Sequence, residues 1–166
     1  MEPIPKNTSR CMRLLGLGNE ILTDDAFGIL VAREVERLKP SQIEVVRSYA
    51  AGFNLLDDLL GPRQLLIVDT IMTGNARPGT IHVFRVDQVP QAPGIAPHCA
   101  GLREVLALGR QLHLDIADEA IVIAVEASDC TTIGGEMNAD VRLAITRAVD
   151  LINRLSTDVG HCYGRV

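Results

Sequence analysis

The feature that most constrains this chain is the stretch of residues 14–28, which reads LLGLGNEILTDDAFG. A short apolar run ends in a glycine-containing turn, the acids Asp24 and Asp25 follow, and an amphipathic segment begins directly afterwards. This order predicts a strand, a tight turn and a helix with carboxylates in its first turn. Ligands of open α/β sheets bind at the carboxyl ends of the strands, so the role of these carboxylates is the central question.

The rest of the chain alternates between apolar runs of strand length and segments with helical spacing of apolar residues. The runs predict strands at 11–17, 43–49, 64–69, 80–86 and 119–127. The helical spacing predicts helices at 24–39, 52–60, 98–112 and 138–155. The runs at 64–69 and 119–127 show no polar alternation, which is typical of strands buried on both faces of a parallel sheet.

This alternation predicts an α/β fold, a three-layer α/β/α sandwich around a mostly parallel, about five-stranded twisted sheet. No helix separates the strands at 64–69 and 80–86, so we expect one antiparallel or edge strand. The length of 166 residues suits one domain. We expect a flexible N-terminal tail at 1–10, a single α/β catalytic domain at 11–156 and a flexible C-terminal tail at 157–166.

The composition excludes several classes of function. The net charge of −5 and the 3% of aromatic residues argue against a nucleic-acid partner, which calls for basic patches and stacking side chains. No apolar run reaches the roughly 20 residues of a membrane helix, so we expect no membrane partner. The polar N-terminus is not a secretion signal, and the four cysteines form no CxxC pair, so we expect a cytoplasmic protein with free thiols.

Three polar residues stand where apolar strands end or helices begin. Asp25 lies in the first turn of the predicted helix after strand one, Asp69 ends the run QLLIVD, and His98 opens the predicted helix at 98–112. In a parallel sheet these positions fall on one edge, where two carboxylates and an imidazole would bind a divalent metal. Helix N-termini disfavour imidazolium, so we expect Asp25 ionised and His98 neutral, both as ligands.

Each of these residues also has a purely structural interpretation. Asp25 is also explained as a simple helix N-terminal acid, Asp69 as a loop cap and His98 as a polar residue at a helix start. We expect Asp24 to cap the helix rather than bind metal. The glycine turn lacks the third small residue of a dinucleotide fingerprint, because Ile21 stands there, and the two acids repel phosphate.

The segment GLGNEILTDDAFG resembles the N-terminal signature of the hydrogenase maturation endopeptidases. The family's first acid precedes a small residue, as Asp25 precedes Ala26 here. Its second acid ends a buried strand, as Asp69 does in LLIVDT, and its Pro-His pair matches Pro97-His98. The segment at 50–52, Ala-Ala-Gly, is similar to the family's glycine-containing stretch after strand two. The loop reading VEASDCTTIGG departs from the family pattern, which often carries a proline there.

The resemblance implies an endopeptidase that removes a C-terminal extension from the precursor of the nickel–iron hydrogenase large subunit after nickel insertion. It implies that Asp25, Asp69 and His98 recognise the nickel and serve the hydrolysis. The nickel is then brought by the substrate, and zinc or cadmium is expected to occupy the same site in vitro. We expect the enzyme to act as a monomer.

Two alternatives stay open at this point. One is a nickel-sensing partner of the large subunit that does not cut it. The other is a hydrolase similar to the peptidyl-tRNA hydrolases, which also carry a GLGN stretch after strand one. That family next has a His-Asn pair where this chain has Asp24 and Asp25, and the acidic charge suits tRNA poorly.

Overall fold

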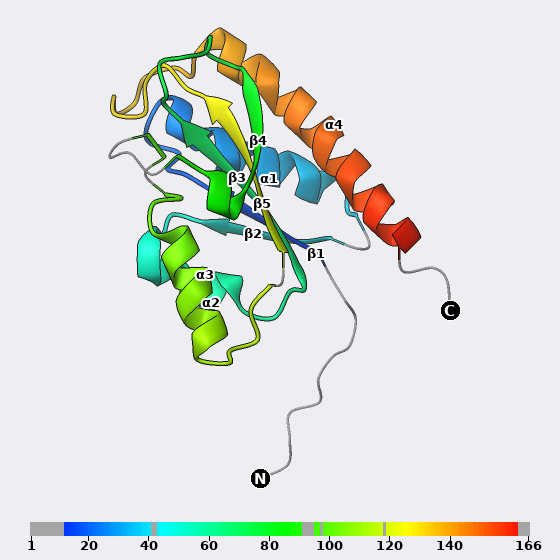
Figure 1. The fold of residues 1–166 in the computed structure, drawn as a ribbon. Coiled ribbons are helices and arrows are strands. Elements are labelled where there is room, and N and C mark those ends of the chain that lie inside the picture. Colours follow the sequence, from blue (N-terminus) through cyan, green and yellow to red (C-terminus); the bar gives the residue numbers. More distant parts are fainter. Residues whose placement is uncertain (1–11, 41–42, 91–94, 97, 118, 163–166) are drawn as a thin grey trace.

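A five-stranded sheet organises the computed structural model of the chain, which describes residues 12–40, 43–90, 95–96, 98–117 and 119–162 (Figure 1). The strand order is β2-β1-β3-β5-β4. The strands are β1 (Met12–Leu17), β2 (Ile43–Ser48), β3 (Gln64–Ile71), β4 (Ile81–Arg85) and β5 (Glu119–Glu126). β1, β2, β3 and β5 run parallel, and β4 pairs antiparallel with β5. The predicted α/β/α fold with one antiparallel edge strand is confirmed.

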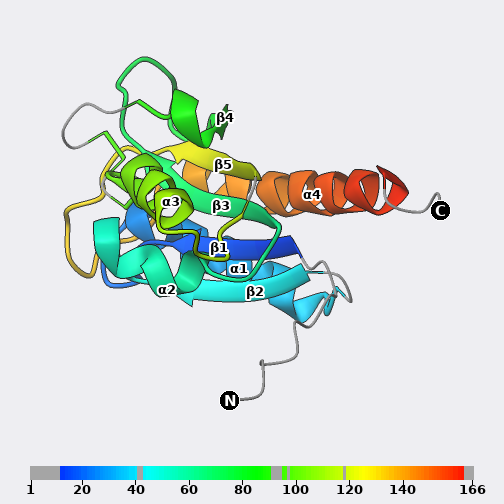
Figure 2. The same cartoon turned by 60° about the horizontal axis from the view of Figure 1, so that its bottom comes forward.

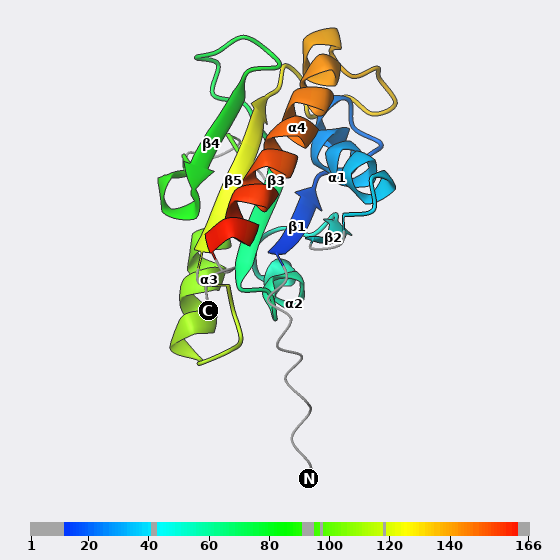
Figure 3. The same ribbon diagram turned by 90° about the vertical axis from the view of Figure 1, so that its right-hand side faces the viewer.

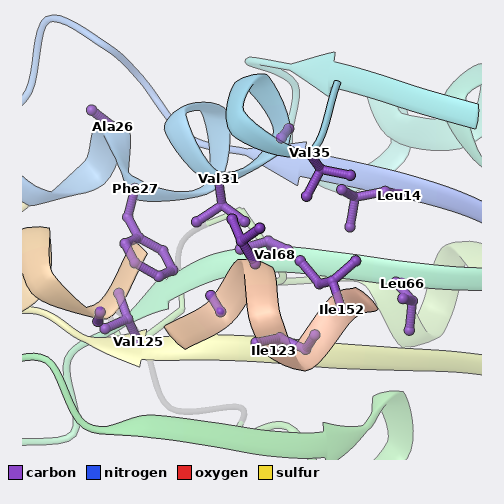
Figure 4. Close-up of a cluster of buried hydrophobic side chains, with 14 of the residues drawn as sticks. Leu14, Ala26, Phe27, Val31, Val35, Leu66, Val68, Ile123, Val125 and Ile152 are labelled. Carbon is purple, nitrogen blue, oxygen red and sulfur yellow. The ribbon is translucent and has the colours of Figure 1, made fainter. Parts of the chain in front are cut away.

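One face of the sheet is covered by α1 (Phe27–Arg37) and α4 (Ala139–Cys162) (Figures 1 and 3). Side chains from β1, β3 and β5 pack there against both helices (Figure 4). The labelled members of this cluster include Leu14, Phe27, Val31, Val68, Val125 and Ile152. Removing such apolar surface from water contributes about 25 cal/mol per Å², which makes this cluster a major source of stability.

The opposite face is covered by α2 (Leu56–Leu59) and α3 (Leu102–Gln111) (Figure 2). Leu15, Leu65, Ile67 and Val122 point to this side, while their neighbours along the strands point to the other. Successive side chains of a strand alternate between faces. Strands with apolar residues at every position are therefore buried on both sides, as the runs without alternation predicted.

Two glycines let α1 begin close against the sheet. A Cβ on Gly28 would overlap the carbonyl oxygens of Leu17 and Val68, and a Cβ on Gly16 would overlap Gly28 itself. No other residue type fits such a close approach of two backbones. The helix start that follows β1 is thereby held directly beside the carboxyl end of β3.

Several predicted boundaries were wrong. β3 continues to Ile71 instead of ending at Asp69, because its ladder with β5 continues from Asp69 through Ile71. The helix predicted to open at His98 begins at Leu102, after Gly101 at φ 78°. α4 runs to Cys162 instead of ending at residue 155, since no proline interrupts it. The tail predicted at 157–166 is therefore helical to Cys162, and residues 1–11 and 163–166 lie outside the described residues.

Candidate metal-binding active site

The carboxyl edge of the sheet brings the three predicted residues together. Asp25 lies in the 3-10 turn η1 (Asp24–Ala26) after β1, Asp69 lies in β3, and His98 lies in the turn before α3. One ligand atom from each lies within 4.8 Å of the others. Both carboxylates are buried, and the His98 side chain is 13% exposed. The matching Pro97 lies outside the described residues.

His98 is held by hydrogen bonds at both ring nitrogens. Nε2 lies 3.0 Å from Oδ2 of Asp25, and Nδ1 lies 3.3 Å from the carbonyl oxygen of Ala50, to which it donates. A carbonyl oxygen only accepts, so the proton on Nδ1 is fixed there. This arrangement leaves Nε2 as the atom that faces the carboxylates, and it is the orienting contact that metal-ligating histidines commonly have.

The prediction of a neutral His98 was wrong for the metal-free protein. The hydrogen bond to Asp25 raises the pKa of His98 to about 9, and the Asp69 carboxylate acts in the same direction against the effect of burial. The predicted helix dipole does not act on the ring, because α3 begins four residues later. His98 therefore carries a proton at neutral pH, and a metal ion must displace it.

Asp69 is enclosed by backbone donors. The amide of Thr70 donates to Oδ1 at 2.8 Å, and the amide of Cys99 donates to Oδ2 at 3.1 Å. Burial raises the pKa of Asp69 to about 6, although His98 and these donors pull it down. Asp69 is thus fixed in direction by its own strand and by the turn that carries His98.

Thr70 and Cys130 extend the network behind Asp25. The Thr70 hydroxyl donates to Oδ1 of Asp25 at 3.2 Å, and the Cys130 thiol donates to the Thr70 hydroxyl at 3.6 Å. Both side chains are buried. We did not select either residue from the sequence. Thr70 was recognisable there as a polar residue directly after Asp69. Successive side chains of a strand alternate between faces, so Thr70 points to the face of the sheet opposite that of Asp69. Oδ1 of Asp25 is thereby occupied, and Oδ2 faces the site.

The prediction that Asp24 caps the helix was wrong. η1 and α1 have no side-chain cap hydrogen bond. The buried Asp24 carboxylate instead accepts from the amides of Ser128, Asp129 and Asn138, at 2.8, 3.1 and 2.7 Å. These three amides belong to the segment that joins β5 to α4. Asp24 therefore ties this segment to the turn that presents Asp25.

The other cysteines and histidines that the structure describes take no direct part in the group of Asp25, Asp69 and His98, which we call the triad. Cys99 and Cys130 are free and buried, and burial raises the pKa of both thiols, to about 12 for Cys130. His82 lies 3.3 Å from the buried Glu126, on β4 and away from His98 in sequence. α4 contains His161 and Cys162, but the structure does not describe their side chains.

The chemistry of the three residues suits a divalent ion. Two carboxylates and one imidazole are an oxygen and nitrogen donor set for zinc, nickel or cadmium, and three protein ligands leave a position for substrate or water. Each of the three residues is held by contacts outside the triad: the Thr70 hydroxyl, two backbone amides and the Ala50 carbonyl. Their roles in metal binding and catalysis remain predictions.

Comparisons with known proteins agree on one family. The model of the family described as hydrogenase maturation protease matches residues 29–155. The chain belongs to the hydrogenase maturation protease family. The matched region includes Asp69 and His98, and Asp25 lies just before it. The resemblance seen in the sequence is confirmed.

Individual relatives carry the same description. The hydrogenase 2 maturation protease of Escherichia coli K12 is 35% identical over 98 residues, 57% of this chain. The hydrogenase expression/formation protein HupD of Thiocapsa roseopersicina is 27% identical over 143 residues, 83% of this chain. The matches span 60% and 64% of the lengths of these two relatives.

Solved structures show the same fold. The hydrogenase maturating endopeptidase HybD from E. coli superimposes with a TM-score of 0.77 at 26% identity, covering 90% of this chain and 94% of that one. A hydrogenase maturation protease HybD from Thermococcus kodakarensis, at 22% identity and a TM-score of 0.65, shares the fold. The part of this chain that the structure describes has no helix that is both long and apolar enough to span a membrane.

Proposed function

We propose that this chain is the endopeptidase that removes a C-terminal extension from the precursor of a nickel–iron hydrogenase large subunit after nickel insertion. The observation that carries the proposal is the convergence of Asp25, Asp69 and His98 at the carboxyl edge of the sheet, in a member of the maturation protease family. Family membership also favours this function over that of a peptidyl-tRNA hydrolase.

The triad is suited to binding a metal ion that arrives with the substrate. In the metal-free protein, the His98 proton bridges to Asp25 and neutralises part of the acidic charge. A divalent ion replaces that proton, because the same nitrogen and the same carboxylate oxygen face the site. The nickel of the precursor is then the ion that Asp25, Asp69 and His98 bind, and zinc or cadmium takes its place in vitro.

The hydrolysis follows from the position of that ion. A divalent ion held by three protein ligands polarises a peptide carbonyl or activates water in its open position. Thr70 and the Ala50 carbonyl keep Asp25 and His98 in place while the substrate enters, and the amides on Asp69 do the same there. The protein acts as a cytoplasmic monomer in this proposal.

A cleavage assay separates the protease from a partner that only holds nickel. The purified chain is incubated with nickel-loaded large-subunit precursor, and the products are separated on a denaturing gel. We expect a smaller large subunit, with Asp69→Ala as the inactive control. Binding of the precursor with no change in its size would show a nickel-holding partner instead.

A further inference from the structure

We propose that four exposed hydrophobic side chains around the triad form a docking surface for the precursor polypeptide on both sides of the scissile bond. The four are Ile21, Tyr49, Phe53 and Ile133, and we call them the apolar rim. The proposal rests on the proposed function, because it names where the substrate of that same site binds.

The rim combines high exposure with a position at the carboxyl edge of the sheet. All four side chains are between 60% and 74% exposed. Aromatic residues are scarce in this chain, which has two tyrosines, three phenylalanines and no tryptophan. Tyr49 and Phe53 are nevertheless placed in water at the edge that carries the site. Exposed aromatic and large aliphatic side chains grouped at one place commonly mark protein interaction sites.

One half of the rim is joined to the Asp25 turn. Leu22 forms an isolated antiparallel bridge with Ile133, and the amide of Gly134 donates to the carbonyl oxygen of Ile21 at 2.8 Å. These contacts bring the turn after β1 and the segment after β5 side by side. Ile21 and Ile133 therefore belong to one local surface, next to the residues that present Asp25.

The other half of the rim is joined to His98. Tyr49 follows β2 directly and precedes Ala50, whose carbonyl oxygen accepts from His98. Phe53 lies in the 3-10 turn η2 (Gly52–Leu55), and Gly52 lies close to Gly101 in the turn that carries His98. The hydroxyl of Tyr49 donates to Glu20 at 2.9 Å, which connects this half to Ile21. Figure 2 shows the segments after β1, β2 and β5 gathered at this end of the sheet.

The charge distribution indicates what kind of partner fits. The centre carries the carboxylates of Asp25 and Asp69 beside a single imidazole, that of His98, so acidic groups outnumber the basic one there, whereas the four rim side chains are uncharged. Glu20 beside the rim is engaged by Arg33 and by Tyr49. A complementary partner brings positive charge to the centre and apolar side chains to the flanks. A polypeptide that carries a bound nickel ion and presents apolar side chains on either side of it has this pattern.

Exposed hydrophobic residues elsewhere provide matched controls. Leu112 is 57% exposed and lies between α3 and β5, at the amino edge of the sheet. Leu143 is 68% exposed and lies on α4. Replacing these residues by serine removes a comparable amount of exposed apolar surface, from α4 and from the amino edge of the sheet rather than from the rim.

The test measures binding of nickel-loaded precursor to Phe53→Ser, Ile133→Ser, the double variant, Leu112→Ser and Leu143→Ser by biolayer interferometry. We expect each rim variant to weaken binding about tenfold or more, because truncating a large side chain that the bound partner buries commonly costs this much at the dominant residues of an interface. The two controls stay within about twofold of the wild type. Nickel titrations and melting curves of all variants show whether the triad and the fold are intact.

The outcomes separate this proposal from the function on which it rests. Rim variants that bind the precursor as tightly as the controls do, in a protein that still cleaves it, overturn the rim and leave the protease intact. A wild-type chain that neither binds nor cleaves the precursor overturns both. If the rim variants instead change the free protein from dimer to monomer in light scattering, with precursor binding unchanged, the rim is an interface between two copies and the proposal is wrong.

Discussion

Replacing Thr70 by valine should weaken metal binding without opening a cavity. Valine has nearly the same shape as threonine but lacks the hydroxyl that donates to Oδ1 of the buried Asp25. A hydrogen bond to a charged group is worth about 1.5–3 kcal/mol. Loss of a contact that orients a metal ligand commonly lowers metal affinity by about 10–100-fold, or about 1.4–2.8 kcal/mol. The two ranges agree, so we expect Thr70→Val to bind nickel about 10–100-fold more weakly.

Isothermal titration calorimetry with nickel at constant pH measures this effect directly. Thr70→Ser is the matched control, because it keeps the hydroxyl and loses only a methyl group. We expect the serine variant to bind nickel within about threefold of the wild type, while its stability falls by about 0.8 kcal/mol for the lost buried methyl. Nickel binding by Thr70→Val within twofold of the wild type would refute the role given to Thr70.

Four further predictions concern the same edge of the sheet. Asp69→Ala should lose nickel, zinc and cadmium binding in calorimetry, and unchanged binding would contradict the triad. The affinity of the free protein for nickel should rise by up to tenfold per pH unit between pH 7 and 9 and level off above pH 9, because the ion displaces the proton of His98, whose pKa is raised to about 9. Calorimetric titrations at four pH values check this, and an affinity that does not change with pH contradicts it. Because folding raises the pKa of His98 to about 9, the protonated ring contributes to the free energy of unfolding. This contribution is complete below about pH 6.5 and is lost as the pH rises through about 9. Asp24→Asn should lower the free energy of unfolding, measured in urea, by about 1–3 kcal/mol, because an amide NH2 group replaces an oxygen that accepts from backbone amides. The control Asp150→Asn, at an exposed position on α4, should have no such effect. Equal losses of stability in the two variants would contradict the role of Asp24.

The fold could be predicted from the sequence because its signals are local. The uninterrupted apolar run at 64–69 is explained by burial of β3 on both faces, and the missing helix before β4 by its antiparallel pairing with β5. The ends of elements were less predictable. β3 extends past Asp69 because β5 continues its ladder, and that information lies more than 50 residues away in the chain.

The sequence was sufficient to predict which residues meet at the candidate site, but not the hydrogen bonds that hold them. Asp25 lies in the turn after a strand, Asp69 lies near the carboxyl end of a strand and His98 precedes a helix, and parallel strands bring such positions to one edge. The contacts of Asp24 with the segment at 128–138, and of Thr70 with Asp25, depend on side-chain directions set by tertiary packing. The protonation of His98 likewise depends on a carboxylate 73 residues away in sequence.

The most direct test of the central claim compares nickel-loaded and nickel-free large-subunit precursors in one experiment. Each is incubated with the wild-type chain, and the products are weighed by intact-protein mass spectrometry. The account predicts loss of a C-terminal peptide from the nickel-loaded precursor alone, with no loss when Asp69→Ala replaces the wild type. Equal cleavage of the nickel-free precursor would contradict metal recognition by Asp25, Asp69 and His98, and no cleavage of either would contradict the protease itself.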